Sequence, residues 1–147
     1  IKLNKIFKTV CIASDHAGFN LKEDIKNYLI DKNVSIFDMG PFVDKSVDYP
    51  DYAKKVTNRV KSKKSEVGIL VCGTGTGMAI SANKTKKIRA AVCYNLKSTR
   101  LSRQHNNANI ITIGSRLTKK NTALKLVSVF LKTKFEGGRH LRRVRKI

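Results

Sequence analysis

The sequence predicts an α/β fold built on a five-stranded parallel sheet. Short apolar runs typical of buried strands alternate along the chain with longer segments whose apolar residues recur at helical spacing. Strands that alternate with helices form parallel β-α-β units with right-handed crossovers. Five such strands permit the order 2-1-3-4-5, which we expect here, followed by a helical tail. A chain of 147 residues, of which 41% are hydrophobic, is expected to form one domain with a substantial core.

The first half of the chain is expected to contribute three strands and two helices. Buried strands are predicted at residues 9–14, 34–37 and 67–71. The first helix is expected to be capped by Asn20 and to bury a face formed by Leu21, Ile25, Tyr28 and Leu29. A loop that contains glycine and proline, over residues 38–50, then leads to a second helix over about residues 52–61.

The second half of the chain is expected to alternate in the same way. Strands are predicted at residues 89–93 and 109–113, and helices at residues 96–104 and 119–133. The last of these helices is strongly amphipathic and directs inward Leu124, Val127, Phe130 and Leu131. Residues 1–7 are expected to be a flexible N-terminus, and residues 134–147 a basic tail that contributes to a site or to a dimer.

The stretch from Val67 to Met78 is the most informative segment. It begins as a buried strand, reaches Cys72 and turns into a loop that contains Gly73, Gly75 and Gly77, after which a helical pattern continues to about Asn83. A strand that feeds a helix through such a loop presents backbone N–H groups at the positive end of a helix dipole, where an anion is bound and a thiolate is favoured. A Gly-x-Gly-x-Gly turn is a weak signal by itself, because tight connections between strands and helices are often glycine-rich.

The predicted sheet brings further polar residues to this loop. The order 2-1-3-4-5 reverses direction between strands one and three, and ligands bind outside the carboxyl ends of the strands at such a point. The carboxyl end of strand one carries Asp15 and His16, and that of strand five carries Gly114-Ser115-Arg116. His105 precedes strand five and therefore belongs at the opposite edge within one subunit, so that either the helix geometry or a second subunit must bring it to Cys72. The expected meeting of Asp15 and His16 with Cys72 at one edge of the sheet favours an active site.

The residue types at this site suit proton transfer on a phosphorylated substrate. A thiolate beside backbone amides fits either acyl transfer or proton abstraction next to a carbonyl, with the enediolate held by N–H donors. Arg139 and Arg143 are four residues apart, so a helical tail places both guanidinium groups on one face, where they suit a phosphate dianion; a solvated basic tail is the alternative. The spacing of residues shows no metal site, and no dinucleotide-binding pattern unless Asp38 is the acidic partner at the end of strand two.

Composition restricts the other classes of function. The net charge of +21 comes from 31 basic and 10 acidic residues and suggests polyanions, but the lysines are scattered without interleaved aromatics, which favours a solvated surface over a nucleic-acid interface. The three cysteines have no Cys-x-x-Cys spacing, so neither a disulfide framework nor a zinc site is indicated. We see neither a membrane span nor a secretory signal and expect a cytoplasmic protein.

Several motifs resemble those of the type B ribose-5-phosphate isomerases. The resemblance covers nearly the whole chain from Lys8 and rests on Ser-Asp-His-Ala-Gly-Phe (14–19), Asp-Tyr-Pro (48–50), Cys-Gly-Thr-Gly-Thr-Gly (72–77), Ser-Arg-Gln-His-Asn-Asn (102–107), Gly-Ser-Arg (114–116) and Glu-Gly-Gly-Arg-His (136–140). It implies a three-layer Rossmann-like sandwich and the interconversion of ribose 5-phosphate and ribulose 5-phosphate without a cofactor. It also implies a homodimer, or a dimer of dimers, whose subunits share their active sites.

The resemblance assigns roles to individual residues. Cys72 matches the base that moves a proton between C1 and C2, and no carboxylate between Gly77 and Ala79 is available to replace it. His105 matches the residue that opens the furanose ring. The enediolate would be held by Thr74 and by the amides of Gly73, Gly75, Thr76 and Gly77. Other substrate contacts are implied for Asp15, Asn106 and Tyr49, and phosphate contacts for His16, Arg116, Arg139 and Arg143.

Two rival functions remain open at this point. An isomerase of a six-carbon sugar phosphate, such as allose or galactose 6-phosphate, differs from the pentose enzyme in pocket depth, which the sequence shows poorly. A nucleic-acid-binding module is suggested by charge alone, and salt-dependent affinity for generic DNA together with inert sugar assays would favour it.

Overall fold

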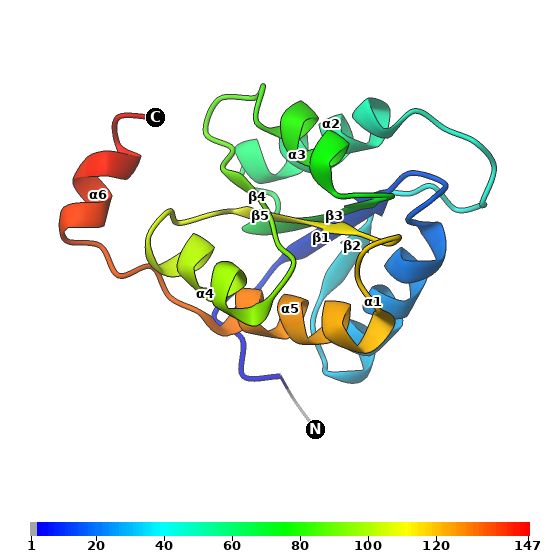
Figure 1. The fold of residues 1–147 in the computed structure, drawn as a ribbon, viewed down its shortest axis with the longest axis horizontal. Coiled ribbons are helices and arrows are strands. Elements are labelled where there is room, and N and C mark those ends of the chain that lie inside the picture. Colours follow the sequence, from blue (N-terminus) through cyan, green and yellow to red (C-terminus); the bar gives the residue numbers. More distant parts are fainter. Residues whose placement is uncertain (1–2) are drawn as a thin grey trace.

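A computed structural model describes residues 3–147, and its centre is a parallel five-stranded sheet (Figure 1). The strands are β1 (Val10–Ser14), β2 (Ile36–Asp38), β3 (Val67–Cys72), β4 (Ala90–Val92) and β5 (Ile110–Gly114). The helices are α1 (Phe19–Asp31), α2 (Tyr49–Lys61), α3 (Thr76–Ala82), α4 (Leu96–Gln104), α5 (Lys120–Lys132) and α6 (Arg139–Val144). The predicted alternation of strands and helices is therefore confirmed.

The helices cover both faces of the sheet. Helices α1, α4 and α5 lie on one face and α2 and α3 on the other, while α6 stands apart at one end of the molecule (Figure 1). Each face buries its own apolar cluster: Ile12, Ile69 and Phe130 belong to the first and Leu70 and Met78 to the second. This arrangement confirms the expected three-layer sandwich with a helical tail.

The predicted order of the last two strands is wrong. The sheet runs β2-β1-β3-β5-β4, so β5 pairs with β3 and β4 lies at the edge. The reason lies in the strands themselves. All five residues of β5 are buried, whereas β4 has three residues that are only half-buried, and a short strand suits an exposed edge. As a consequence, Gly114 pairs directly with Cys72, and Ser115 and Arg116 follow immediately beside it.

Two helix starts also differ from the prediction. Asn20 does not cap α1, which begins at Phe19 with Gly18 in the cap position. The Asp15 carboxylate accepts a hydrogen bond from the Gly18 N–H at 2.9 Å and so takes the part expected of Asn20. Helix α2 begins at Tyr49, three residues before the predicted start, because Pro50 is favourable in the first turn of a helix, where its missing N–H costs nothing.

The N-terminal residues that the structure describes lie along the first cluster. Leu3 and Phe7 pack against it, and the Ile6 N–H donates to the Leu131 carbonyl oxygen at 2.9 Å. Ile1 and Lys2, which also belong to the predicted flexible N-terminus, lie outside the described residues. Within residues 3–147 we find no helix that is both long enough and apolar enough to cross a bilayer.

A buried lysine holds the loop between β2 and α2. The Lys22 ammonium group is fully buried and donates to both carboxylate oxygens of Asp38 and to the Pro41 carbonyl oxygen at 2.8–2.9 Å. The rings of Phe19 and Phe42 lie 5.2 and 5.6 Å from it. All three ammonium protons therefore have acceptors, which a buried charge requires.

Replacing Lys22 with methionine is expected to lower the free energy of unfolding by about 3 kcal/mol, because it leaves the Asp38 carboxylate without its buried partner. Urea unfolding measures the change. Lys26→Met is the matched control, since Lys26 also bonds Asp38 but is partly exposed, and it should cost less. Equal losses in the two variants would show that burial of the Lys22 charge does not increase its contribution to the free energy of unfolding.

The same ion pair predicts a pH dependence. Burial alone would raise the pKa of Asp38, but hydrogen bonds from Lys22 and Lys26 outweigh it and lower the pKa below the ordinary value of 3.8. The carboxylate therefore stabilises the fold above pH 3.8, and this contribution disappears as the pH falls through the lowered pKa. The difference in unfolding free energy between the wild type and Asp38→Asn should be constant near neutrality and shrink at acid pH. A difference that grows as the pH falls would contradict a lowered pKa of Asp38.

Candidate active site

Cys72 ends β3 and differs chemically from the other two cysteines. Its sulfur accepts a hydrogen bond from the Gly75 N–H at 3.2 Å, and 4% of the residue is exposed. Burial raises the pKa of Cys11 to about 11 and also raises the pKa of Cys93, so both of these thiols stay protonated near neutral pH. Cys72 is thus the cysteine whose sulfur faces a backbone donor in a strand-to-helix turn.

The turn after Cys72 has the tight geometry that its glycines predict. Gly75 has a φ of +81°, a left-handed conformation that strains residues with a side chain. The Thr112 hydroxyl donates to the Gly75 carbonyl oxygen at 2.8 Å. A Cβ added to Gly114 would lie 2.5 Å from the Thr74 carbonyl carbon, so the end of β5 and the turn are in close contact. The Thr76 N–H donates to the Thr74 hydroxyl at 3.3 Å, which also fixes the Thr74 side chain.

An arginine and a tyrosine lie against the glycines of this turn. The Arg116 guanidinium covers Gly73, since a Cβ added to that glycine would come within 2.9 Å of Arg116 Nη1. The Tyr49 ring covers Gly77 in the same way, at 2.8 Å from Cε1. The Arg116 N–H also donates to the Gly73 carbonyl oxygen at 2.9 Å. The structure therefore brings to the turn both Arg116, which the sequence places at this edge of the sheet, and Tyr49, for which the resemblance implies a substrate contact.

Strand β1 delivers two further candidates to the same edge of the sheet. Asp15 is 8% exposed, and its N–H donates to the Val71 carbonyl oxygen at 3.1 Å, which places it one residue from Cys72 across the sheet. His16 is exposed, and its Nδ1 lies 3.2 Å from both the N and the O atoms of Val47. The loop before α2 thus positions the His16 ring.

The remaining candidates form a second group at the other end of the molecule. His105 is the C-terminal cap of α4, Asn106 follows it, and Arg139 and Arg143 belong to α6, which lies at the end opposite to the β3–α3 turn (Figure 1). A cavity of about 280 Å³ between α4 and α6 is lined by residues that include His105, Asn106 and Arg143. Within one chain the structure does not bring this group to Cys72, in agreement with the edge predicted for His105.

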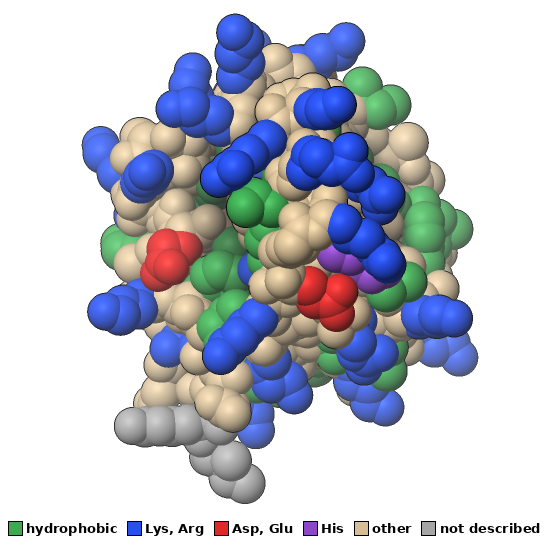
Figure 2. Space-filling view, turned by 90° about the vertical axis from the view of Figure 1, so that its left-hand side faces the viewer, with side chains coloured by type: hydrophobic (Ala, Val, Ile, Leu, Met, Phe, Trp, Pro, Cys, Tyr) green, Lys and Arg blue, Asp and Glu red, His purple; other side chains and the backbone are tan. Residues whose placement is uncertain are grey.

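The second group lies on a basic face. Lys and Arg side chains cover the side of the molecule that carries α6, with few acidic ones among them (Figure 2). The His105 ring stacks on the His140 ring, with centroids 4.3 Å apart. Burial lowers the pKa of His140, and the positive charges of His105 and Arg139 lower it further. This end of the molecule therefore favours anionic ligands.

Comparison with known proteins decides the family. The model of the ribose/galactose isomerase family matches residues 10–147, which include both groups of candidate residues. The chain belongs to the ribose/galactose isomerase family. Ribose-5-phosphate isomerase B of Escherichia coli is 41% identical over 140 residues, which are 95% of this chain and 94% of that protein. A probable ribose-5-phosphate isomerase B of Mycoplasma genitalium is 44% identical over 140 residues, 94% and 92% of the two chains.

Solved structures agree with this membership of the ribose/galactose isomerase family. A ribose 5-phosphate isomerase of Thermotoga maritima is 51% identical and superimposes with a TM-score of 0.92 over 94% of this chain and 95% of that one. The structure of ribose-5-phosphate isomerase B from Mycoplasma genitalium holds bound ribulose-5-phosphate. It is 43% identical, with a TM-score of 0.90 over 94% and 92% of the two chains.

The structure adds one residue of this isomerase that the sequence analysis missed. Tyr94 lies just beyond β4, and its hydroxyl donates to the Thr74 carbonyl oxygen at 3.4 Å, so that it reaches the turn after Cys72. Its position after a predicted strand was an available signal. The predicted order placed strand four beside strand three and therefore already put this position near the turn, but no motif or charge distinguished Tyr94 from the other residues that follow that strand.

Proposed function

We propose that this protein interconverts ribose 5-phosphate and ribulose 5-phosphate by moving a proton between C1 and C2 through an enediolate, without a cofactor. The observation that carries the proposal is the Cys72 sulfur at 3.2 Å from the Gly75 N–H, beside the Arg116 guanidinium over Gly73. The sulfur can accept a proton, and the backbone N–H groups and the guanidinium group beside it can stabilise negative charge. Relatives that are named ribose-5-phosphate isomerase B and share 41–44% of its residues support the choice of substrate.

Cys72 acts as the base in this proposal. Its thiolate takes the proton from C2 of the open aldose, a C1=C2 bond forms and the carbonyl electron pair moves to the C1 oxygen. The C2 hydroxyl proton then passes to the C1 oxygen, the C2 carbonyl forms, and the thiol returns its proton to C1. Backbone N–H groups of the turn, with Thr74, stabilise the charge on the enediolate oxygens as an oxyanion hole does. The Gly75 N–H already bonds the sulfur, so the amides of Gly73 and Gly77 are the ones we assign to the enediolate.

The phosphate group would bind to the basic side chains of both groups. On the Cys72 side these are His16 and Arg116, with Asp15 and Tyr49 at the sugar hydroxyls. On the other side they are Arg139 and Arg143, one helical turn apart on α6, with Asn106 at a hydroxyl. Since one chain keeps the two groups at opposite ends, we infer a homodimer in which each site takes one group from each subunit.

The test of the proposed function is a coupled assay that compares ribose 5-phosphate with allose 6-phosphate and galactose 6-phosphate. We expect kcat/KM for ribose 5-phosphate to exceed the others by at least about tenfold, the discrimination that one additional carbon typically gives. A preference for either hexose phosphate would assign the other activity of this family. Inactivity with all three sugars would overturn the proposal.

His105→Ala is expected to impair ring opening more than proton transfer. Ribose 5-phosphate closes to a furanose, whereas a four-carbon aldose 4-phosphate cannot, because its C4 oxygen carries the phosphate. We expect kcat/KM to fall by about 10²-fold for the pentose, the usual contribution of a general acid or base, and much less for the tetrose. Equal losses on both substrates would remove the ring-opening role from His105.

A further inference from the structure

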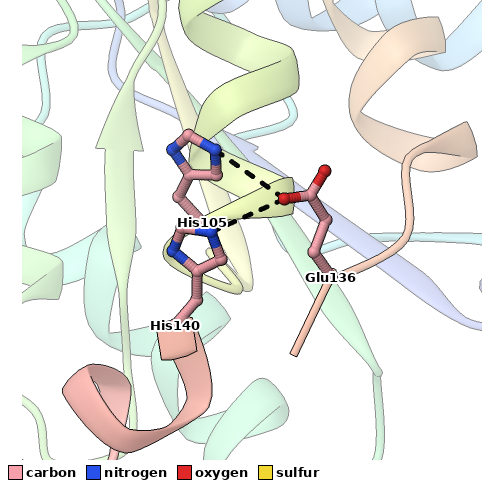
Figure 3. A group of neighbouring side chains, drawn as sticks. All are labelled: His105, Glu136 and His140. Carbon is pink, nitrogen blue, oxygen red and sulfur yellow. Dashed lines mark ion pairs between the residues drawn. The ribbon is translucent and has the colours of Figure 1, made fainter. Parts of the chain in front are cut away.

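Three potential metal ligands meet between α4 and α6. The Nε2 atoms of His105 and His140 lie 3.8 and 3.5 Å from the same carboxylate oxygen of Glu136 (Figure 3). The three ligand atoms lie within 4.8 Å of one another. The two rings are almost parallel, at 10°, so both Nε2 atoms face the carboxylate from one side. The cluster thus presents two imidazoles and one carboxylate around a single point.

The backbone holds these residues in place. The Glu136 N–H donates to the Gln104 carbonyl oxygen at 3.1 Å, which ties the segment before α6 to the end of α4. Gly137 and Gly138 have φ values of +70° and +57°, and this left-handed pair turns the chain so that α6 returns toward His105. The His140 N–H closes the turn by donating to the Gly137 carbonyl oxygen at 3.1 Å. The three side chains therefore converge because of the local fold.

Two of the three ligand-to-ligand distances are close to those around a tetrahedral metal ion. Metal–nitrogen and metal–oxygen bonds of about 2.0–2.2 Å place neighbouring tetrahedral ligand atoms about 3.4 Å apart. The distance from His140 Nε2 to the Glu136 oxygen is already 3.5 Å, and that from His105 is 3.8 Å. A single ion must lie near the plane of each ring, so binding requires His105 to turn out of its stack on His140. The side chains of His105 and Glu136 are 39% and 50% exposed and have room for this rotation.

The ligand types select the class of ion. Two imidazoles and one carboxylate, with a fourth position open, are typical of zinc and similar borderline transition metals, whereas magnesium prefers oxygen ligands. The positive charges of Arg139 and Arg143 on the same helix oppose any cation, so the affinity should be lower than that of a structural zinc site. The metal site could not be recognised from residue spacing because His105 and Glu136 are 31 positions apart in the sequence.

We propose that His105, Glu136 and His140 bind a divalent transition-metal ion of the zinc type, and that the bound ion withdraws His105 from ring opening. The second half of this statement rests on the proposed function, and the first half does not. The site would make the isomerase sensitive to free zinc while its thiol and its amide donors remain intact.

Calorimetric titration of the metal-free protein with Zn²⁺ tests the site without any substrate. We expect one ion per chain, no binding of Mg²⁺, and a loss of affinity of at least about tenfold in Glu136→Gln and in His140→Gln, since even indirect contacts of a metal change affinity by 10–100-fold. Asp44→Asn is the matched control for charge and should bind as the wild type does. Unchanged affinity in both ligand variants, or no binding in the wild type, would overturn the site. Co²⁺ absorption reports tetrahedral coordination in the same variants, and its absence in the wild type would also overturn the site.

A direct assay of ketose formation tests the consequence. Zn²⁺ should inhibit turnover of ribose 5-phosphate, a chelator should restore it, and Glu136→Gln should require at least about tenfold more Zn²⁺ for the same inhibition. The four-carbon aldose phosphate should be affected much less. Binding without inhibition would keep the metal site and overturn the link to His105. If the protein binds Zn²⁺ but turns over no sugar phosphate, the proposed function is wrong and the metal site still stands.

Discussion

Cys72→Ala is expected to lower kcat for ribose 5-phosphate by about 10³-fold or more, within the range that removal of a positioned general base produces. The substrate should still bind, because the turn and Arg116 keep their contacts through the backbone. Arg116 N–H bonds the Gly73 carbonyl oxygen, and Thr112 bonds that of Gly75, and neither bond involves the sulfur. Steady-state kinetics measures the first effect and calorimetry of ribose 5-phosphate binding the second.

Cys93→Ala is the control for this prediction. Cys93 is fully buried and burial raises its pKa, but it belongs to the apolar cluster on the other face of the sheet from Cys72. It should lose some stability and little activity. Turnover by Cys72→Ala within about tenfold of the wild type would exclude the sulfur as the base, because a general base contributes at least 10²-fold.

Two inactive variants are expected to restore activity to each other when their subunits mix. Cys72→Ala damages the group at the β3–α3 turn, and His105→Ala damages the group between α4 and α6. If each site takes one group from each subunit, a mixed dimer has one intact site. Half of randomly formed dimers are mixed, so about one quarter of the wild-type activity should return. Activity of co-refolded variants, with mixed dimers verified by mass, measures the effect.

The control for this experiment mixes Cys72→Ala with Arg116→Ala. Both changes fall on the same group of residues, so each site of the mixed dimer carries a defect and no activity should return. Mixed dimers of Cys72→Ala and His105→Ala that stay as inactive as their parents would show that the subunits do not share sites in this way.

Local sequence patterns predicted the helices and strands well and the order of the strands in the sheet less well. The predicted helix over residues 96–104 has the bounds of α4, since the Asn95 side chain caps it by accepting the Ser98 N–H. The predicted order of β4 and β5 was wrong because each strand is apolar enough for either position. Which strand lies at the edge depends on strand length and on burial in the folded sheet. The cap of α1 was missed because Asp15 acts from outside the helix.

The candidate site was predictable where it follows from the ends of strands. The edges assigned to Asp15, Cys72 and Arg116 depend only on strand direction, which the alternation of elements determines. The direct pairing of Cys72 with Gly114 depends on strand order and was not predictable. The contact of Tyr94 with Thr74 depends on the path of the chain beyond β4, which the sequence pattern does not show. The meeting of Glu136 with two histidines depends on how α6 turns back.

The most direct test of the central claim follows the C2 proton of ribose 5-phosphate by NMR in D₂O, with wild-type protein and with Cys72→Ala at equal, saturating occupancy. The wild type should incorporate deuterium as the aldose and the ketose interconvert. Cys72→Ala should bind the sugar and leave its C2 proton in place over the same period. Exchange at a rate near that of the wild type would show that another group moves the proton and would contradict the account.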